Sequence, residues 1–393
     1  MLSGGLPRVT FTKGGEMRAL RILHIPGGAV WGGGESYVLT LVRYLPREKF
    51  HLEVLCPEEG VLVQNLKRLG IPTYRMNFTP LINPLTILRL TLFLKRHSFD
   101  IVQSHGARMN FYTRVAGRIA NVPSLISTHH FSLSSYPVTS WRKGVYKTLD
   151  RWSAKFASIN LCVAETLAKE LREESGYSPD TIRFIPNGVD TEKMDPTKIS
   201  GQSIREEFGV DNRFLVVAGG RMNPEKDHTT FLKALARVKA AIPDVKALLI
   251  GEGPLREELQ NLAVSLGLKD TCFFPGFRSD VPEILGAADL FVLSSVSEGM
   301  PFMVLEALAL ERPVVATDVY GVSEIIRHNQ EGLLVPARSP DAMADSIVTL
   351  LKDSTQARHL GKAGRKHVQT YHSTQKIIQM WQDLYQQGKQ TDG

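Results

Sequence analysis

Two glutamates in the stretch SEGMPFMVLEALALERPVVAT, residues 297–317, stand eight positions apart around a glycine and a proline. Pro301 suits the first position of a helix, because the amide there has no intrahelical partner in any case. The next amides would then be unpaired, and the helix dipole favours phosphate oxygens beside them. Glu306 lies about one turn into this helix, and helical side chains lean toward the N-terminus, so its carboxylate can reach the same place as that of Glu298.

Two carboxylates and a set of free amides suit a ligand with both phosphates and vicinal hydroxyls, because carboxylates accept hydrogen bonds from diols. A sugar nucleotide has both groups. The competing explanation is that Glu306 is an ordinary glutamate of a first helical turn. The candidate ligand-binding residues of this stretch are Glu298, Met300, Pro301, Phe302, Met303, Val304 and Glu306.

Two other loops offer groups that suit a diphosphate. In AGGRMNPEKDH, residues 218–228, Arg221 and Lys226 follow an apolar strand and would supply a planar fork and a point charge. Taken alone, such cations more often form structural salt bridges. In PGGAVWGGGE, residues 26–35, Gly32 and Gly33 precede a helix whose first amides attract anions. This loop is neither a dinucleotide-binding fingerprint nor a P-loop, so a merely tight turn is the alternative.

Histidines end two predicted strands in the first half of the chain. His105 stands in VQSHG, and His129 and His130 stand in ISTHHF. Imidazole is the side chain that most readily gains or loses a proton near neutral pH. A histidine pair at a strand end is nevertheless more often structural than catalytic.

These residues must be positioned by two sets of strands. Short apolar runs rich in Val, Ile and Leu alternate with amphipathic helical segments, a pattern typical of parallel sheets covered by helices on both faces. We therefore predict an α/β fold with two doubly wound, Rossmann-like domains whose strand ends face a shared crevice. The predicted strands are LRILHIPG, FHLEVLCP, IPTYRM, FDIVQSHG, SLISTHH, SINLCVAE and TIRFIPNG in the first half and FLVVAGGR, VKALLIGEG, CFFPGF, LFVLSS, PVVATDV and GLLVPAR in the second.

The predicted domain division follows PNGVD, because residues 191–202 are polar and contain proline and glycine. Residues 1–16 are a candidate disordered extension, residues 17–190 the N-terminal domain and residues 191–370 the C-terminal domain. Helices are expected over residues 340–352, 355–370 and 373–388. The last carries Trp381 and Tyr385 on one face and must cover an apolar surface, in its own domain or in the N-terminal one.

Composition is that of an ordinary globular chain of 393 residues, with 43% hydrophobic and 22% charged residues. The three cysteines stand far apart in apolar runs and are expected in the core, free of disulfides and metal. No apolar run is long enough to span a membrane, and the N-terminus lacks the apolar segment of a signal peptide, so a cytoplasmic location is expected. Residues 1–190 carry 24 Lys and Arg against 14 Asp and Glu, whereas residues 191–393 carry 23 against 26.

A basic first half predicts an anionic partner, either an acidic membrane surface or a nucleic acid, with a merely solvated surface as the alternative. The stretch SSYPVTSWRKGVYKTLDRW, residues 134–152, mixes cations with aromatic residues as interfacial segments do. We expect peripheral contact with an anionic membrane there. The basic residues counted for this surface are Arg89, Lys95, Arg96, Arg108, Arg114, Arg118, Arg142, Lys143, Lys147, Arg151 and Lys155.

The chain resembles the retaining GT-B glycosyltransferases of family 4, also called glycosyl transferases group 1, from about residue 20 to residue 385. The most specific match is the E-x7-E of SEGMPFMVLEALALERPVVATDVYGVSEII. The resemblance implies that Glu306 binds the nucleotide ribose and that Glu298 approaches the transferred sugar. It also implies a GT-B fold, in which two Rossmann-like domains face a cleft.

Other matches follow the same resemblance. Gly32 and Gly33 of GGxE would approach the donor diphosphate, and Arg221 and Lys226 would neutralise it, although Asp227 stands where the family often has glycine. In the T-x-H pattern, His130 would lie near the reacting sugar as a catalytic residue, with Glu298. Candidate acceptor or interdomain residues are His105, His129, Asn187 of PNGVD and Glu324 of GVSEII.

The implied reaction moves a sugar from a nucleoside-diphosphate sugar, most commonly a UDP-sugar, to an acceptor hydroxyl with retention of configuration. The implied acceptor is a glycan or a lipid-linked saccharide of cell-surface polysaccharide, lipopolysaccharide or glycolipid assembly. No D-x-D occurs in the chain, so no metal or other cofactor is expected. The alternatives are a nucleotide-sugar hydrolase or epimerase of the same fold, and a basic nucleic-acid-binding protein, which is disfavoured because no nucleic-acid-binding motif is present.

Overall fold

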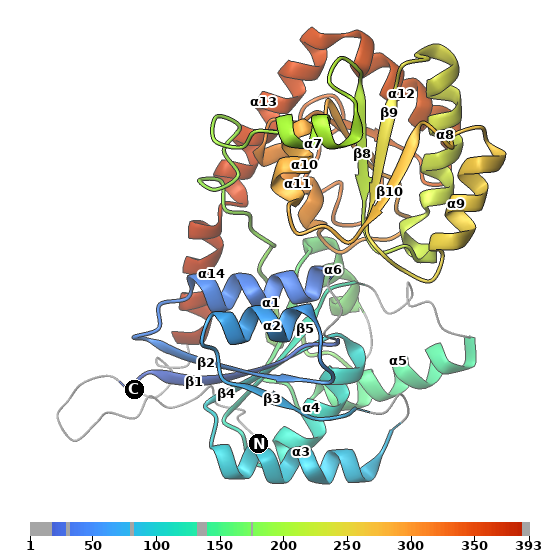
Figure 1. The fold of residues 1–393 in the computed structure, drawn as a ribbon. Helices are drawn as coiled ribbons and strands as arrows, with labels where there is room; N and C mark the ends of the chain where they lie inside the picture. Colours follow the sequence, from blue (N-terminus) through green and yellow to red (C-terminus); the bar gives the residue numbers. More distant parts are fainter. Residues whose placement is uncertain (1–17, 29–31, 79–81, 132–139, 174–175, 387–393) are drawn as a thin grey trace. The chain divides into compact units, whose positions relative to one another are not determined.

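A computed structural model places residues 18–28, 32–78, 82–131, 140–173 and 176–386 (Figure 1). The contacts of the chain divide it into two units. Unit 1 runs to Pro186 and resumes at Ile377, and unit 2 is Asn187–Lys376. The proposed extension, residues 1–16, lies outside the described residues.

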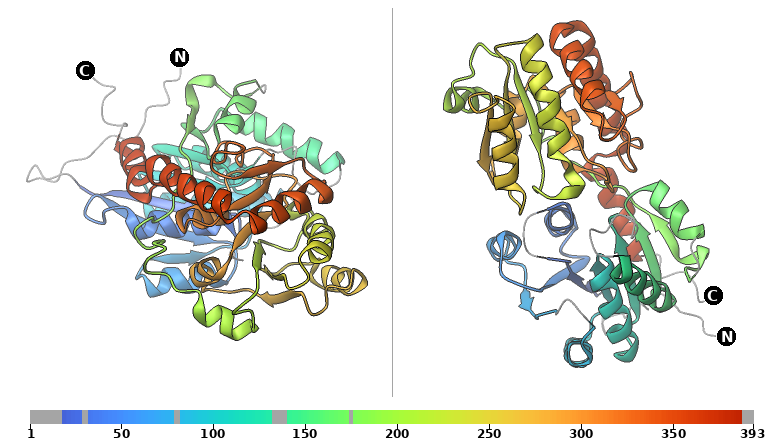
Figure 2. Two further views of the ribbon diagram at one scale, coloured as in Figure 1. Left: turned by 90° about the horizontal axis from the view of Figure 1, so that it is seen from above. Right: turned by 90° about the vertical axis from the view of Figure 1, so that its right-hand side faces the viewer.

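Unit 1 is built on a sheet of seven parallel strands in the order β3-β2-β1-β4-β5-β6-β7. Its helices α3, α4 and α5 pack beside one another, as α1 and α2 do (Figures 1 and 2). The strands are β1 (Leu20–Ile25), β2 (Phe50–Cys56), β3 (Thr73–Arg75), β4 (Ile101–His105), β5 (Ser124–His129), β6 (Ile159–Cys162) and β7 (Ile182–Phe184). The helices are α1 (Gly33–Tyr44), α2 (Val61–Arg68), α3 (Pro84–His97), α4 (Ala107–Ile119), α5 (Ser140–Ala154), α6 (Glu165–Glu173) and the 3-10 turn η2 (Pro179–Thr181).

Unit 2 repeats the plan with six parallel strands in the order β10-β9-β8-β11-β12-β13. Helices α8, α9 and α12 enclose its largest apolar core against the sheet. The strands are β8 (Leu215–Gly219), β9 (Lys246–Ile250), β10 (Cys272–Gly276), β11 (Leu290–Leu293), β12 (Val314–Thr317) and β13 (Leu333–Val335). The helices are α7 (Gln202–Phe208), η3 (Pro224–Lys226), α8 (His228–Ala241), α9 (Arg256–Ser265), α10 (Val281–Ala287), α11 (Phe302–Ala309), α12 (Pro340–Lys352) and α13 (Ser354–Tyr371).

The predicted strands are all confirmed. Strands such as β4, β5, β8 and β11 are buried on both faces, and such apolar runs carry a signal that depends little on context. Each sheet also has a switch point, where the strand order reverses: between β1 and β4 in unit 1, and between β8 and β11 in unit 2. Ligands of open α/β sheets bind beyond the carboxyl ends of the strands at such points. The three cysteines are buried and free, as expected.

The C-terminal helix α14 (Thr374–Gln386) covers an apolar surface of unit 1. Trp381 is fully buried, and its ring meets that of Tyr37 edge-on with centroids 5.7 Å apart. Tyr385 packs on Phe50 and donates a hydrogen bond of 2.5 Å to Oε1 of Gln103 in β4. Of the two surfaces that the sequence left open for this helix, the one it covers belongs to unit 1.

Candidate active site

Lys226 and Glu298 form an ion pair at the switch point of unit 2. Lys226 Nζ donates to Glu298 Oε1 at 2.6 Å, and Ser295 Oγ donates to the same oxygen at 2.6 Å. The loops after β8 and β11 are joined as well by a backbone bond of 2.9 Å from the Val296 amide to the Glu225 carbonyl, and Ser294 Oγ donates to the Lys226 carbonyl at 2.9 Å. The two residues, 72 positions apart in sequence, are therefore held as one group.

Asp227 explains the departure from the family's glycine. Its backbone is left-handed, with φ 45° and ψ 46°, a region that glycine enters freely and that aspartate tolerates better than most residues. The side chain also caps α8, because its Oδ1 accepts from the Thr230 amide at 3.4 Å, and its Oδ2 accepts from Thr230 Oγ1 at 2.7 Å. Aspartate therefore serves the same turn, and the charge of Lys226 beside it is kept.

Arg221 follows β8 on an exposed part of the same loop. Its guanidinium forms no ion pair among the described residues, whereas Lys226 on the same loop does form a salt bridge, which was the alternative for these cations. Gly219, the last residue of β8, allows close packing: a Cβ there would lie 2.7 Å from Cε of Met303. This contact sets the first turn of α11 against the end of β8.

Helix α11 begins one residue later than predicted. Pro301 has ψ 119° and is the N-cap, so Phe302 is the first helical residue. The amides of Phe302, Met303 and Val304 still lie in the first turn, where no intrahelical acceptor exists. The prediction of free amides is unaffected by the shift.

Glu306 lies on the same helix, with its side chain partly in contact with solvent. The surrounding protein raises the pKa of Glu306 to about 7, because burial disfavours its charged form. A hydrogen-bond donor such as a ribose hydroxyl would stabilise the carboxylate.

Asn187 of PNGVD holds the loop that precedes α11. Its Nδ2 donates to the Met300 carbonyl at 2.7 Å, and His372 contacts the Asn187 carbonyl through Nδ1 at 3.1 Å. Gly321, at the start of GVSEII, has φ 70° and lies against Gly299, where a Cβ would stand 1.2 Å from the carbonyl oxygen. Glu324 lies in the turn after β12, half-buried.

Three histidines form a row at the switch point of unit 1. His24 Nδ1 lies 3.2 Å from His105 Nε2, and His105 Nδ1 lies 3.3 Å from His130 Nε2. The neighbouring rings are nearly parallel, and Tyr37 meets two of them edge-on. Burial lowers the pKa of His24 to about 3 and that of His130 to about 4, and it lowers the pKa of His105 as well, so the row is uncharged at neutral pH.

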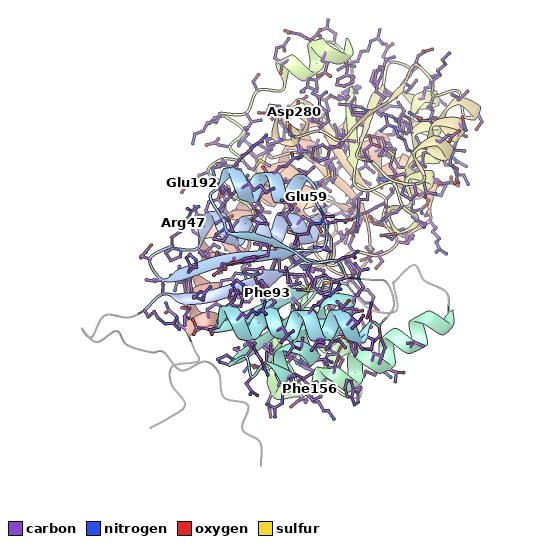
Figure 3. The ribbon with its side chains drawn as sticks, turned by 60° about the horizontal axis from the view of Figure 1, so that its bottom comes forward. Arg47, Glu59, Phe93, Phe156, Glu192 and Asp280 are labelled. Carbon is purple, nitrogen blue, oxygen red and sulfur yellow. The ribbon has the colours of Figure 1, made fainter. Side chains whose placement is uncertain are left out.

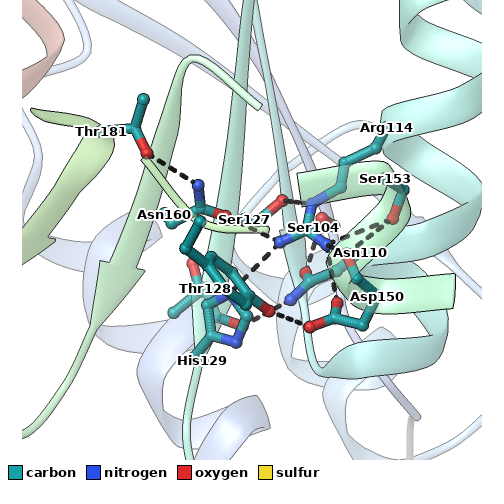
Figure 4. Close-up of polar contacts among 11 residues, drawn as sticks. Ser104, Asn110, Arg114, Ser127, Thr128, His129, Asp150, Ser153, Asn160 and Thr181 are labelled. Carbon is teal, nitrogen blue, oxygen red and sulfur yellow. Dashed lines mark hydrogen bonds and ion pairs between the residues drawn. The ribbon is translucent and has the colours of Figure 1, made fainter. Parts of the chain in front are cut away.

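His129 belongs to a different cluster from its neighbour. It is buried, and its Nε2 lies 3.3 Å from Nη2 of Arg114 (Figure 4). Arg114 also donates to Asp150, Ser127 and Asn160, at 2.7, 2.8 and 2.7 Å. Counting Arg114 with the surface cations was wrong, because its side chain is fully buried in this network.

Gly32 is the N-cap of α1, and Gly33 is its first residue. Val38, Leu41 and Val42 of this helix are buried. Of the proposed interfacial stretch, residues 132–139 with Tyr136 lie outside the described residues, and nothing is described of the Trp141 and Tyr146 side chains. Trp152 is 50% exposed, and Lys155 lies over its ring.

Sequence reasoning missed His24 and Ser295. His24 lies near the end of the apolar run LRILHIPGG, for which only a strand is predicted. A polar residue near the carboxyl end of a buried strand is nevertheless a signal of a functional site. Ser295 lies three residues before Glu298 in LSSVSEG and gave no signal of its own.

Two family models together match most of the chain. The model "Glycosyltransferase Family 4" matches residues 31–193, and "Glycosyl transferases group 1" matches residues 201–367. The putative glycosyltransferase EpsD of Bacillus subtilis is 30% identical over 81% of this chain and 84% of its own length. The chain belongs to glycosyltransferase family 4.

Another relative is the UDP-Gal:alpha-D-GlcNAc-diphosphoundecaprenol alpha-1,3-galactosyltransferase of Escherichia coli, which is 28% identical over 93% of this chain and 96% of its own length. Among solved structures, Anabaena HepE in complex with UDP and glucose superposes with a TM-score of 0.82 at 22% identity, over 93% of this chain and 99% of that one. The fold is therefore GT-B, and the chain is a nucleotide-sugar-dependent retaining glycosyltransferase.

The described residues contain no group of three or more His, Cys, Asp or Glu side chains placed to hold a metal ion. None of the helices within the placed ranges combines the length and apolar character that crossing a bilayer would take.

Proposed function

We propose that this glycosyltransferase moves a hexose from a UDP-sugar to a hydroxyl of a glycan or lipid-linked acceptor at an anionic membrane surface. The observation that carries the donor half is the Lys226–Glu298 pair at the switch point of unit 2, with the first turn of α11 packed on the end of β8. A cation and free amides match a diphosphate leaving group. The Escherichia coli relative is a UDP-Gal-dependent galactosyltransferase and Anabaena HepE binds UDP and glucose, which favours uridine as the base.

Each residue has a role in this proposal. Lys226 and Arg221 neutralise the charge that develops on the departing diphosphate, and the amides of Phe302, Met303 and Val304 bind its oxygens. Glu306 accepts hydrogen bonds from the ribose diol. Glu298 and His130 contact the transferred sugar. Gly32 and Gly33 offer the first amides of α1 to the diphosphate.

The acceptor half of the proposal rests on a different observation. The excess of basic residues belongs to the first half of the chain, and the Escherichia coli relative acts on a diphosphoundecaprenol-linked sugar. We therefore expect the acceptor to be anionic, with a polyprenyl diphosphate as the first candidate. Metal independence remains a prediction, which activity in excess EDTA would test.

The test is a panel of UDP-, GDP- and ADP-sugars screened by thermal shift, because a ligand that binds only the folded state raises its melting temperature. Donors that bind are then incubated with polyprenyl diphosphate-linked saccharides and the products analysed for anomeric configuration. Stabilisation by UDP-sugars and a glycosylated, retained product support the proposal. UDP release at the same rate without acceptor would instead identify a hydrolase, and binding of none of the three classes would overturn the donor assignment.

A further inference from the structure

The outer face of α3 in unit 1 is apolar and exposed. Leu85, Leu88 and Leu92 are 61%, 54% and 46% exposed, and they share one side of the helix because they are spaced by three and four residues. Its inner side, with Leu90 and Leu94, is buried against α4 and the core of unit 1. Figure 3 displays α3 at the front of unit 1, with Phe93 labelled upon it.

Cations flank this leucine strip on both sides. At 100° per residue, Lys95 lies on one side of the strip, and Arg89 and Arg96 lie on the other, all three exposed. The helix contains no acidic residue. Long basic side chains can extend to charged groups beyond an apolar strip, and a strip with flanking cations is the pattern of helices that lie in a membrane interface.

We infer that α3 is the element by which unit 1 docks on a membrane carrying anionic lipids. An apolar partner alone would leave the three cations unpaired, whereas phosphate-bearing lipid headgroups around buried acyl chains match both features. This contact on α3 is separate from the one predicted for residues 134–152. The inference rests on the proposed membrane-linked acceptor, but vesicle binding tests it without turnover.

The experiment is flotation of the full chain with vesicles of phosphatidylcholine alone or mixed with phosphatidylglycerol. We expect binding to the mixed vesicles, lost about tenfold or more in Leu85→Ser/Leu88→Ser/Leu92→Ser. Each of Arg89→Gln, Lys95→Gln and Arg96→Gln should lower binding about fivefold. The matched control is Val264→Ser on α9, a residue 57% exposed in unit 2, which should bind as the wild type does.

Two results would overturn the docking role: equal flotation of the triple-serine variant and the wild type, or no preference for phosphatidylglycerol. A change from dimer to monomer in the triple-serine variant, with no vesicle binding by the wild type, would identify a second copy as the occupant instead. UDP-glucose should still raise the melting temperature of every variant. Such a retained shift shows that donor binding is intact, so a loss of vesicle binding concerns the docking role of α3 and not the proposed donor.

The histidine row carries a second, independent inference. Two hydrogen bonds in line between three neutral imidazoles require the protons to point the same way, because each ring has one N–H and one acceptor. His24 Nε2 is buried and has no partner within the described part of the chain. A proton on that atom would be an orphaned donor, and buried N–H groups without an acceptor are rare. The proton of His24 is therefore on Nδ1.

The geometry then points to a fixed tautomer of His130, in which Nε2 accepts from His105 and Nδ1 carries the proton. His24 and His105 are positioning residues that keep the remaining nitrogen of His130 a hydrogen-bond donor, suited to a sugar oxygen. Which ring nitrogen is protonated is set by the partner of the other one. This role rests on the proposed contact of His130 with the sugar.

The tautomer is measured by ¹⁵N spectra of the histidine-labelled protein, which distinguish protonated from bare ring nitrogens without any reaction. We expect His130 to be protonated at Nδ1, and His24→Leu to mix its tautomers and lower kcat about tenfold or more. His24→Asn should rescue both, because its amide can donate from the position of Nδ1. A wild-type His130 protonated at Nε2, or a His24→Leu variant with unchanged spectrum and kcat, would refute the positioning role of His24 and His105.

The spectrum also distinguishes failure of the positioning role from failure of the proposed glycosyltransferase reaction. If no donor is turned over, the His130 tautomer in the wild type and in His24→Leu still decides the positioning role.

Discussion

The two units share one plan and place different chemistry at their switch points. Unit 2 presents charge: Lys226 has a single carboxylate partner and a side chain that is 19% exposed. Unit 1 presents neutral imidazoles, and its buried cation, Arg114, is fully enclosed by the partners shown in Figure 4. A cation with one exchangeable partner can turn to a ligand, whereas a cation whose donors are all engaged serves the fold.

This contrast matches what each half of the proposed reaction needs. A departing diphosphate gains negative charge, so cations in unit 2 stabilise the transition state more than the ground state. A sugar is uncharged, so neutral donors suit it, and lowered pKa values keep the three histidines neutral. The difference therefore follows the charge of the ligand group that each unit would hold.

The largest expected effect tests the structural cation. Arg114→Met should destabilise the protein by about 3–5 kcal/mol, because it leaves Asp150 buried without its charged partner. Urea unfolding followed by circular dichroism measures the loss, with Arg118→Met, an exposed arginine of the same helix, as the control. A stability equal to that of the control would mean that the network contributes little to unit 1.

Lys226→Met tests the opposite side of the comparison. It should lower kcat about 100- to 1,000-fold, as loss of a group that stabilises transition-state charge does. It should destabilise the protein less than Arg114→Met does, because Lys226 is 19% exposed and Glu298 keeps its hydrogen bond from Ser295. Steady-state kinetics with the donor found by thermal shift give the number. Lys233→Met, an exposed lysine of α8, is the matched control. Near-normal turnover by Lys226→Met would remove the leaving-group role and with it the contrast between the units.

The same reasoning predicts a pH dependence for Glu306. If its carboxylate accepts from the ribose, the proton that it holds with a pKa of about 7 must leave on binding. Affinity for UDP-glucose should then rise about tenfold from pH 6 to pH 8 and level off above the pKa. Calorimetric titration is suitable because a sugar diphosphate ester does not titrate near neutrality.

Glu306→Gln serves as the control for this dependence. Glutamine has no proton to lose, so its affinity should be flat over the same range. An equally steep rise in the glutamine variant would assign the titration to another group.

Sequence reasoning went furthest where the signal is local. The strands follow from apolar runs. The loop with Arg221 and Lys226 follows β8, and the E-x7-E stretch follows β11. The carboxyl ends of parallel strands lie at the same edge of a sheet, so these loops are expected close together. The Pro301 helix was placed one residue early, because proline suits both the N-cap and the next position and only its ψ decides. Contacts that depend on strand order could not be predicted. His24 contacts His105 because β1 and β4 are neighbours in the sheet, although β2 and β3 lie between them in the chain.

Helix α3 shows a different limit. Its leucines occur on both sides of the helix, so periodicity alone does not predict which of them are buried. The packing of α4 on α3 decides that Leu90 and Leu94 are buried and that the leucine strip is exposed. The prediction that Arg114 lies on the surface was wrong for a similar reason, because its partner Asp150 lies 36 residues away on another helix. Long-range pairing cannot be read from spacing.

The smallest expected effect concerns Asp227, where the chain departs from its family. Asp227→Ala should cost about 1 kcal/mol, because it removes the cap of α8 and places a Cβ without capping ability in a left-handed turn. Asp227→Gly should be within a few tenths of the wild type, since glycine loses the cap but relieves the strain. Urea unfolding compares the two. If glycine were as costly as alanine, the backbone conformation would not be the reason for the family's glycine, and a contact of the aspartate with Lys226 or its ligand would have to be sought instead.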